Sequence, residues 1–355
     1  MNRIQSVDLF RIIAIFSIIL IHTSPFNSTY FGDEEPYSLP GIIINQLSRF
    51  AVPFFFTISG YFWGKKVQST LNPLGTAHQF GKRIGVILIF WSAIYSFPIS
   101  NLEVYSYLID GNIRSVYWIL ISHFQEILDF IINHPLTFLM RGTKVHLWFL
   151  TSLLFCSYIA AIFVNARKTK LLTILSLSLY VFALQAKAYI NTPLGIDIGV
   201  IEFNTRNGPF FGLLPFVTGY LISSRQIRDT WAYWGLTLIA LGLLMHFSEI
   251  YYLWKHYNVD PYQDFVAGTY FMGTGITLIT LSNPNPLRIR AISNIGKYTL
   301  GIYASHIIFE NLLSQILTST HSLLWELGYP IIVFLLSLAL TIALAKSRIT
   351  KRFVM

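Results

Sequence analysis

The first apolar segment of the chain reads Val7-Asp-Leu-Phe-Arg-Ile-Ile-Ala-Ile-Phe-Ser-Ile-Ile-Leu-Ile-His22. Its length suits a helix that spans a membrane, which takes about 20 apolar residues, yet it carries three polar groups that a simple anchor does not need. Asp8 and Arg11 are three residues apart and can pair on one helical face. Arg11 and His22 are eleven residues apart, which is about 20° past three full turns and about 16 Å along the axis. These two side chains therefore share one face at different depths.

The depth of His22 makes it a candidate functional residue, because an ionisable side chain inside a span is costly to bury. The structural alternative is a hydrogen bond from His22 to a neighbouring helix. A secretory signal of this length would be cleaved, but the run continues into Thr23-Ser-Pro-Phe-Asn-Ser28 without a small-x-small cleavage site. We therefore expect the segment to be retained in the protein.

The composition indicates a polytopic membrane protein. Apolar residues make up 54% of the 355 residues and charged residues only 12%, whereas soluble domains are about 25% charged. The length leaves no room for a sizeable soluble domain, so we expect residues 1–355 to form a single transmembrane domain. The single cysteine, Cys156, excludes an intrachain disulfide and a cysteine-based metal site.

We expect an all-α fold with ten membrane-spanning helices, at about 8–27, 41–64, 83–100, 146–165, 170–186, 208–223, 231–250, 264–282, 297–318 and 329–345. With the N-terminus in the cytoplasm, 18 of the 25 Lys and Arg fall on the cytoplasmic side. Positive residues are retained on that side, so the chain is predicted to be N-in and C-in. The net charge of +9 then reflects topology and anionic lipid, and no nucleic-acid partner is expected.

The second predicted span holds Arg49 within its apolar stretch, shortly before Pro53. Proline interrupts a helix and frees carbonyls that need other partners, so Arg49 is a candidate substrate-binding residue. The alternative is snorkelling of Arg49 to the outer interface. Lys82 and Arg83 follow an inner loop, Thr70 to Gly81, at the mouth of the third span. This pair is either a topology signal or a phosphate site.

The longest predicted outer stretch, Asn101 to Lys144, has an apolar middle that is interrupted by His123, Glu126 and Asp129. Their spacing of three places them on one helical face, so we expect an amphipathic helix that lies at the interface or re-enters the membrane. An eleventh span would place every later loop on the opposite side of the membrane, and the excess of Lys and Arg on the cytoplasmic side would be lost. The ordinary explanation of the polar face is solvation, and a metal site from His123, Glu126 and His134 is the alternative.

Two further segments carry polar side chains inside or beside predicted spans. His146 and Trp148 open the fourth span, and both are candidate substrate-binding residues. Trp148 fits the aromatic belt of an interface, and a plain interfacial position is the alternative for His146. In the ninth span, His306 lies about 13 Å from the inner end by helix rise, with Tyr303 and Glu310 on its face. His306 is a candidate catalytic residue and Tyr303 a candidate substrate contact, with a structural hydrogen-bond cluster as the alternative.

Together these segments resemble the acyltransferase 3 family of integral membrane O-acyltransferases. The matching pieces are Asp8-x-x-Arg11, Arg11 followed by His22 after ten residues, Ser48-Arg-Phe-Ala-Val-Pro-Phe-Phe-Phe-Thr-Ile-Ser-Gly60, His146-Leu-Trp148 and Tyr298-Thr-Leu-Gly-Ile-Tyr-Ala-Ser-His306. Each piece is short, and their shared order along essentially the whole chain makes the likeness specific. Within the family, these motifs are most similar to those of the enterobacterial common antigen O-acetyltransferase type.

The resemblance implies a multi-pass protein of the cell inner membrane with acetyl-CoA as its cytoplasmic donor substrate, no permanently bound cofactor, and a cell-surface or lipid-linked glycan hydroxyl as acceptor. The essential first-helix Arg and His of the family map onto Arg11 and His22. Many members have paired Arg residues near the third helix, where this chain has Lys82-Arg83. Many also carry an acidic residue soon after the fourth-span Trp, where Thr151-Ser152 follows here. No fused extracytoplasmic hydrolase-like domain is seen, so a single-module member is implied.

Acetyl transfer to a hydroxyl requires a base, donors for the developing oxyanion and cations for the phosphates of CoA. An imidazole with a reference pKa of about 6.5 suits the base, so His22 is the candidate. Arg11, about 16 Å nearer the cytoplasm, suits the phosphate end of CoA together with Arg83. Direct transfer and an acetyl-histidine relay are both open.

Two other functions are compatible with this sequence. A transporter or flippase of a glycan or lipid-linked precursor also places Arg and His inside the membrane and uses broken helices. A glycan polymerase is similarly polytopic and rich in aromatic residues. Neither of these alternatives is expected to use an acetyl donor, so turnover of acetyl-CoA distinguishes them from the acyltransferase.

Overall fold

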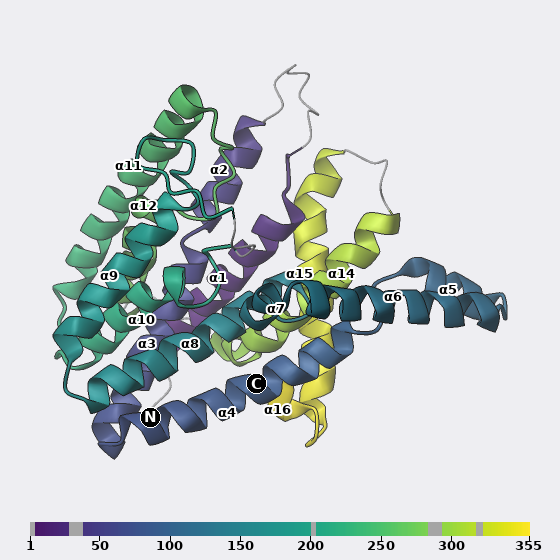
Figure 1. Cartoon of the computed structure of the whole chain (residues 1–355), viewed down its shortest axis with the longest axis horizontal. Coiled ribbons are helices and arrows are strands. Elements are labelled where there is room, and N and C mark those ends of the chain that lie inside the picture. Colours follow the sequence, from purple (N-terminus) through teal and green to yellow (C-terminus); the bar gives the residue numbers. More distant parts are fainter. Residues whose placement is uncertain (1–3, 28–37, 200–203, 283–292, 317–321) are drawn as a thin grey trace.

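The computed structural model describes residues 4–27, 38–199, 204–282, 293–316 and 322–355. Within these ranges every regular element is helical, which confirms the all-α prediction. The elements in chain order are α1 (Gln5–Thr23), α2 (Leu39–Ser48), α3 (Ala51–Thr70), α4 (Pro73–Tyr95), α5 (Leu102–Ile109), α6 (Ile113–Asn133), α7 (Pro135–Arg141), η1 (Val145–Leu147), α8 (Trp148–Asn165), α9 (Thr169–Gln185), α10 (Pro209–Ser223), α11 (Trp231–Tyr257), α12 (Ala267–Leu281), η2 (Asn294–Tyr298), α14 (Thr299–Ile316), α15 (Leu323–Lys346) and α16 (Lys351–Val354). Most of them gather in one bundle (Figure 1).

Each of the ten predicted spans coincides with a helix or a pair of helices. In the part of the chain that the structure describes, six helical stretches are long and apolar enough to cross a membrane, namely Gln5–Thr23, Leu39–Thr70, Ile113–Asn133, Val145–Asn165, Trp231–Tyr257 and Leu323–Lys346. The helices α9 and α10 are apolar but shorter. These helices indicate a membrane protein, and the count of ten spans with both termini inside stays a prediction.

The second predicted span is divided into α2 and α3. Proline clashes with the carbonyl four residues earlier in a helix, and the residue four before Pro53 is Arg49. The helix α2 ends at Ser48, directly before Arg49, and α3 begins at Ala51. Pro53 therefore lies in the first turn of α3, where its missing N–H is tolerated. The predicted break is confirmed, and it places Arg49 at a joint inside the chain.

The third predicted span begins about ten residues too late. Helix α4 already begins at Pro73, and the side chain of Asn72 accepts a hydrogen bond of 2.8 Å from the N–H three residues later. An Asn cap followed by Pro is a strong start signal, and it outweighs the glycines that suggested a loop over Thr70 to Gly81. Lys82 and Arg83 consequently lie within α4 and not at its mouth.

The amphipathic helix predicted in the long outer stretch is α6, and it lies outside the bundle. Only 6% of its apolar stretch is buried, and α5 and α6 extend sideways from the other helices in Figure 1. His123 Nε2 lies 3.3 Å from the carbonyl oxygen of Tyr95. Among the described residues, no group of His, Cys, Asp or Glu is arranged to hold a metal ion. The metal site considered for His123, Glu126 and His134 is therefore not formed.

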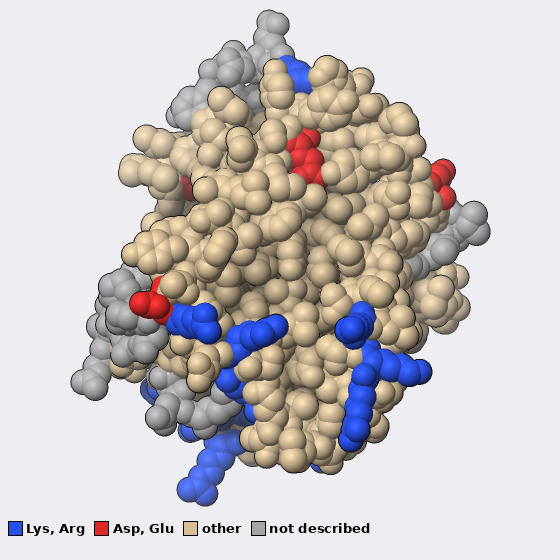
Figure 2. Space-filling view, turned by 90° about the vertical axis from the view of Figure 1, so that its left-hand side faces the viewer, with Lys and Arg blue, Asp and Glu red and all other residues tan. Residues whose placement is uncertain are grey.

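Lys and Arg side chains gather at the lower end of the face shown in Figure 2. This end, called the basic end below, is also where the described chain begins and where α4 starts in Figure 1. Arg3, Arg288, Arg290 and the acidic loop Asp33–Glu35 belong to the predicted charge distribution but lie outside the described residues. The visible asymmetry agrees with a basic end that faces the cytoplasm.

Cysteine tags are expected to report this orientation. Tags at Asn112 and Tyr257 should react with an impermeant thiol reagent applied from outside, and tags at Gln68, Lys168 and Arg228 should react only after the membrane is opened. The native thiol gives little background because Cys156 is buried. Labelling of Asn112 or Tyr257 only from inside would contradict the ten-span topology. A tag at Asp33 should also label from outside, although this position lies outside the described residues.

Candidate functional site

Helix α1 arranges the first two candidate residues. It runs without a break from Gln5 to Thr23, so Arg11 and His22 share a face at different depths, as the spacing predicts. Arg11 NH1 lies 3.2 Å from Asp8 Oδ1, which confirms the predicted pair. The guanidinium of Arg11 also lies 5.4 Å from the ring centroid of Phe62 on α3. These contacts hold the Arg11 side chain at the lower part of the bundle.

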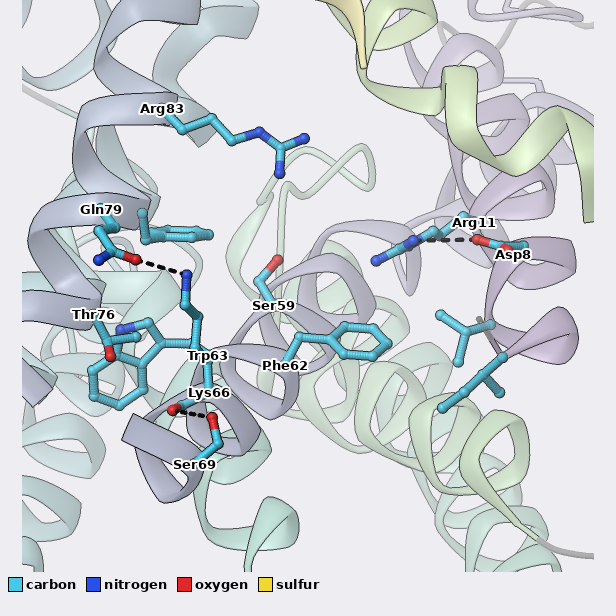
Figure 3. A pocket seen from close by; sticks show the side chains of 13 residues that line it. Asp8, Arg11, Ser59, Phe62, Trp63, Lys66, Ser69, Thr76, Gln79 and Arg83 are labelled. Atoms are coloured by element: carbon cyan, nitrogen blue, oxygen red, sulfur yellow. Dashed lines mark hydrogen bonds and ion pairs between the residues drawn. The ribbon is translucent and has the colours of Figure 1, made fainter. Parts of the chain in front are cut away.

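A cavity of about 750 Å³ opens at the basic end between α1, α3 and α4. Figure 3 shows Arg83 from α4 and Arg11 from α1 reaching into this cavity from opposite sides. Lys66 on α3 also lines it and donates a hydrogen bond of 2.8 Å to Gln79 Oε1. Three cations around one cavity suit a ligand with several phosphate oxygens, which guanidinium groups bind through paired donors.

The structure separates the two members of the predicted basic pair. Both side chains are exposed, but Arg83 lines the cavity and Lys82 does not. Successive residues of a helix point 100° apart, and Lys82 points away from the cavity that Arg83 lines. Lys66 was missed as a site residue because it lies in a Lys65-Lys66 pair that the sequence presents only as a topology signal.

A second cavity, of about 370 Å³, links this basic cavity to the interior. The residues that it shares with the basic cavity are Arg11, Ser59, Phe80 and Arg83. The residues that it shares with a third, smaller cavity of about 60 Å³ are Ile18, Phe55, Phe149 and Tyr303. The three cavities therefore form a series that follows the face of α1 from Arg11 to His22.

The innermost cavity lies beside three histidines that come from separate parts of the chain. His22 and His146 line it. The ring of His306 on α14 lies 5.1 Å from the ring of His22 and 5.4 Å from the ring of His146, measured between ring centroids. The sequence marks each histidine as a candidate, and the tertiary structure brings all three together.

Backbone carbonyls fix the orientation of two of these rings. His306 Nδ1 lies 2.6 Å from the carbonyl oxygen of Tyr303, and His146 Nε2 lies 3.3 Å from that of Ala304. A carbonyl only accepts, so each of these nitrogens carries a hydrogen. The other nitrogen of each ring is buried without a hydrogen-bond partner among the described residues. In the neutral rings, these nitrogens are acceptors available to a bound molecule.

Tyr303 joins the histidines to one another. Its hydroxyl donates a hydrogen bond to the carbonyl oxygen of His146, and its ring lines both the second and the third cavity. The hydroxyl of Tyr95 donates a bond of 2.7 Å to the carbonyl of Ala304, and its ring centroid lies 5.0 Å from that of His146. The predicted substrate contact Tyr303 is therefore also a structural support of the site.

An ion cluster borders the innermost cavity on the side away from the basic end. Asp264 lies 3.0 Å from Arg49, 2.9 Å from Arg206 and 2.9 Å from Lys187. The three cations therefore share the one carboxylate of Asp264. Arg49 is only 9% exposed and is paired with Asp264 inside the protein, and its role as a substrate-binding residue stays a prediction.

Trp148 supports this cluster, since the guanidinium of Arg206 lies 5.0 Å from its ring centroid. Arg49, Trp148, Arg206 and Asp264 all line the innermost cavity. Sequence reasoning found Arg49 and Trp148 but missed Arg206 and Asp264. The sequence held one indication of Asp264: an arginine within an apolar stretch, such as Arg49, requires an acidic partner from another segment.

Comparison with known proteins agrees with this arrangement. The model of the acyltransferase 3 family, described as an acyltransferase domain, matches residues 4–346. The chain belongs to this family.

Similar curated proteins include an amino-acid racemase of Enterococcus faecalis, which is 28% identical over 59% of this chain and 28% of its own length. A serine/alanine racemase of Enterococcus gallinarum is 22% identical over 86% of this chain and 47% of its own length. The chain thus spans less than half the length of these relatives. No solved structure matches this chain.

Proposed function

We propose that the protein transfers an acetyl group from acetyl-CoA, bound at the basic end, to a hydroxyl of a cell-surface or lipid-linked glycan. The observation that carries this proposal is the series of three cavities that leads from Arg11, Lys66 and Arg83 to the histidines. Because acetyl-CoA is cytoplasmic, the basic end faces the cytoplasm, and the membrane is the cell inner membrane.

The donor binds with its charged and uncharged parts in different cavities. The phosphates lie among the cations of the basic cavity, where charge-assisted hydrogen bonds hold them. The pantetheine arm follows α1 through the second cavity, whose walls include Phe55, Phe80 and Phe149. The thioester then reaches the innermost cavity, about 16 Å from Arg11 along the helix axis.

His22 acts there as the general base. The acceptor oxygen attacks the thioester carbonyl while its proton passes to the imidazole. The tetrahedral intermediate collapses, the carbon–sulfur bond breaks, and the proton returns from the imidazolium to the departing thiolate of CoA. His306 lies 5.1 Å from His22 between ring centroids and packs against it, which restricts the rotation of its ring. Arg49 and Arg206 border the same cavity on the acceptor side.

The racemase activity named for the relatives is not part of this proposal, because the match covers less than half of each relative. The transporter or flippase alternative predicts no chemistry on acetyl-CoA. Purified protein should release free CoA from acetyl-CoA when a glycan acceptor extract is supplied, and mass spectrometry should find an acetyl group on that acceptor. Absence of both CoA release and acetylation would remove the acyltransferase proposal and favour transport.

The donor site yields a matched pair of variants on α4. Arg83→Gln should weaken acetyl-CoA binding about ten- to hundredfold, the effect of losing hydrogen bonds to a charged group. Lys82→Gln removes the same charge from the adjacent exposed position and should leave binding unchanged. Microscale thermophoresis with a labelled CoA measures both. If both variants lost the same affinity for acetyl-CoA, binding would depend only on the overall positive charge of the basic end and not on a specific contact of Arg83.

Arg11→Lys provides an independent check of the donor site from the opposite wall. Lysine keeps the positive charge beside Asp8, whose carboxylate is buried, but it loses the paired donors of the guanidinium. We expect normal insertion and weaker binding of acetyl-CoA in the same assay. Unchanged affinity in both Arg11→Lys and Arg83→Gln would rule out the basic cavity as the donor site.

A further inference from the structure

The ion cluster around Asp264 contains more positive charge than it neutralises. Asp264 forms ion pairs with Arg49, Arg206 and Lys187, so these four side chains together carry a net charge of +2 (three cations and one carboxylate). Burying unbalanced charge is costly, and a cluster whose only role was to join helices would need a single cation for its carboxylate. The carboxylate of Asp260 acts on Arg49 from outside the cluster, and counting it still leaves a net charge of +1. The remaining surplus indicates a further anion.

The hydrogen-bond donors of the cluster point to the same conclusion. Arg49 NH1 and Arg206 NH1 both bond to Oδ1 of Asp264, and Lys187 bonds to Oδ2. Arg49 Nε donates to Asn45 Oδ1 at 3.0 Å. A guanidinium has five N–H donors, and Arg206 Nε is buried without a partner among the described residues. Donors are therefore left for a ligand oxygen.

The surplus charge lies beside the reaction centre. Arg49 and Arg206 line the same small cavity as His22 and His146. The basic cavity that suits the CoA phosphates is at the other end of the series and does not include either of these arginines. An anion bound to Arg49 and Arg206 is therefore distinct from the phosphates of CoA.

We propose that the acceptor carries an anionic group, a phosphate or a carboxylate, that binds to Arg49 and Arg206 and places its hydroxyl next to His22. This inference rests on the proposed transfer reaction and names the class of its acceptor, an acidic or phosphate-bearing saccharide. Asp264 orients the two guanidinium groups, and the guanidinium of Arg206 lies 5.0 Å from the ring centroid of Trp148, which limits its movement.

Thermal unfolding of the purified protein, without acetyl-CoA, tests the site with three sugars. The probes are N-acetylglucosamine 1-phosphate, glucuronate and neutral N-acetylglucosamine. At least one anionic sugar should stabilise the protein at a concentration about tenfold or more below that of the neutral sugar. The sugar that does so distinguishes a phosphate from a carboxylate. Added salt should weaken this stabilisation, since ions screen the attraction.

Variants show whether the cluster is responsible. Arg206→Gln should abolish the preference for the anionic sugar, and Arg206→Lys should keep part of it because the charge stays. Lys255→Gln is the matched control, since Lys255 is an exposed cation outside the cavity, and it should bind like the wild type. Equal stabilisation by the neutral sugar, or an unchanged preference in Arg206→Gln, would overturn the proposal.

This outcome is separate from that of the proposed function. Acetyl-CoA turnover by a protein that shows no preference for anionic sugars would overturn the acceptor class alone. Binding of an anionic sugar by a protein that never turns over acetyl-CoA would support the anion site and remove the acyltransferase.

Discussion

Replacing His22 with Gln is expected to lower the rate of acetyl transfer by about 10²- to 10⁴-fold, the usual contribution of a general base. Glutamine keeps a hydrogen-bonding side chain of similar length but cannot accept the proton of the attacking hydroxyl. The charged groups that bind the donor lie about 16 Å away along α1, so the affinity for acetyl-CoA should not change. Release of CoA and acetylation of the acceptor measure the rate, and thermophoresis measures the affinity.

His246→Gln is the matched control for this experiment. His246 is fully buried, and its ring nitrogens lie 3.0 Å from Thr269 Oγ1 and 3.0 Å from Gln46 Oε1. It does not line any of the three cavities. An amide in its place can still bond to one of these partners, so the variant should retain most of its activity. A comparable loss in both variants would indicate disturbed folding and not lost catalysis.

The alternative outcome moves the catalytic role to another histidine. If His22→Gln still acetylates the acceptor at more than a tenth of the wild-type rate, the base lies elsewhere. His306 is then the first candidate and His146 the second, because each has a buried ring nitrogen without a partner among the described residues. The variants His306→Gln and His146→Gln, measured in the same assay, would show which of the two carries the role.

Alanine at Gly60 or Gly219 is expected to destabilise the folded protein by about 3 kcal/mol or more. Helices α3 and α10 pack backbone against backbone at these two positions. A methyl group at Gly60 would overlap the carbonyl oxygen of Phe216, and one at Gly219 would overlap that of Thr57. Backbone cannot rotate away as a side chain can, so the two helices would have to separate. The loss should appear as a lower melting temperature in detergent and a smaller monodisperse fraction.

Gly85→Ala is the control for this pair. Gly85 lies on α4, and a Cβ built there has no atom within 4 Å. Alanine favours a helix over glycine by about 1 kcal/mol, so this variant should unfold at the same temperature as the wild type or higher. Normal stability in both Gly60→Ala and Gly219→Ala would show that α3 and α10 are further apart than described. Because α3 also carries Ser59 and Lys66 of the basic cavity, a shift of α3 should weaken donor binding as well.

The sequence by itself determined the features that depend on one helix. The faces and depths of Arg11 and His22 follow from 1.5 Å and 100° per residue, and α1 is unbroken between them. The break at Arg49 follows from the clash of Pro53 with the carbonyl four residues earlier. The apolar runs of the chain also predicted its helices. A helix forms its backbone hydrogen bonds within its own segment, so its presence depends on local sequence.

Only the tertiary structure decided which side chains meet. Arg49 and Asp264 are 215 residues apart, and His22, His146 and His306 come from three separate elements. Helical periodicity tells which face a residue occupies, but the neighbour of that face depends on the packing of all the helices. The rotation of α4 is set in the same way, and it directs Arg83 into the basic cavity and Lys82 away from it. Arg83 and Lys82 are adjacent in the sequence and point about 100° apart on α4. Packing against neighbouring helices sets the rotation of α4, and this rotation decides which of the two lies in the cavity.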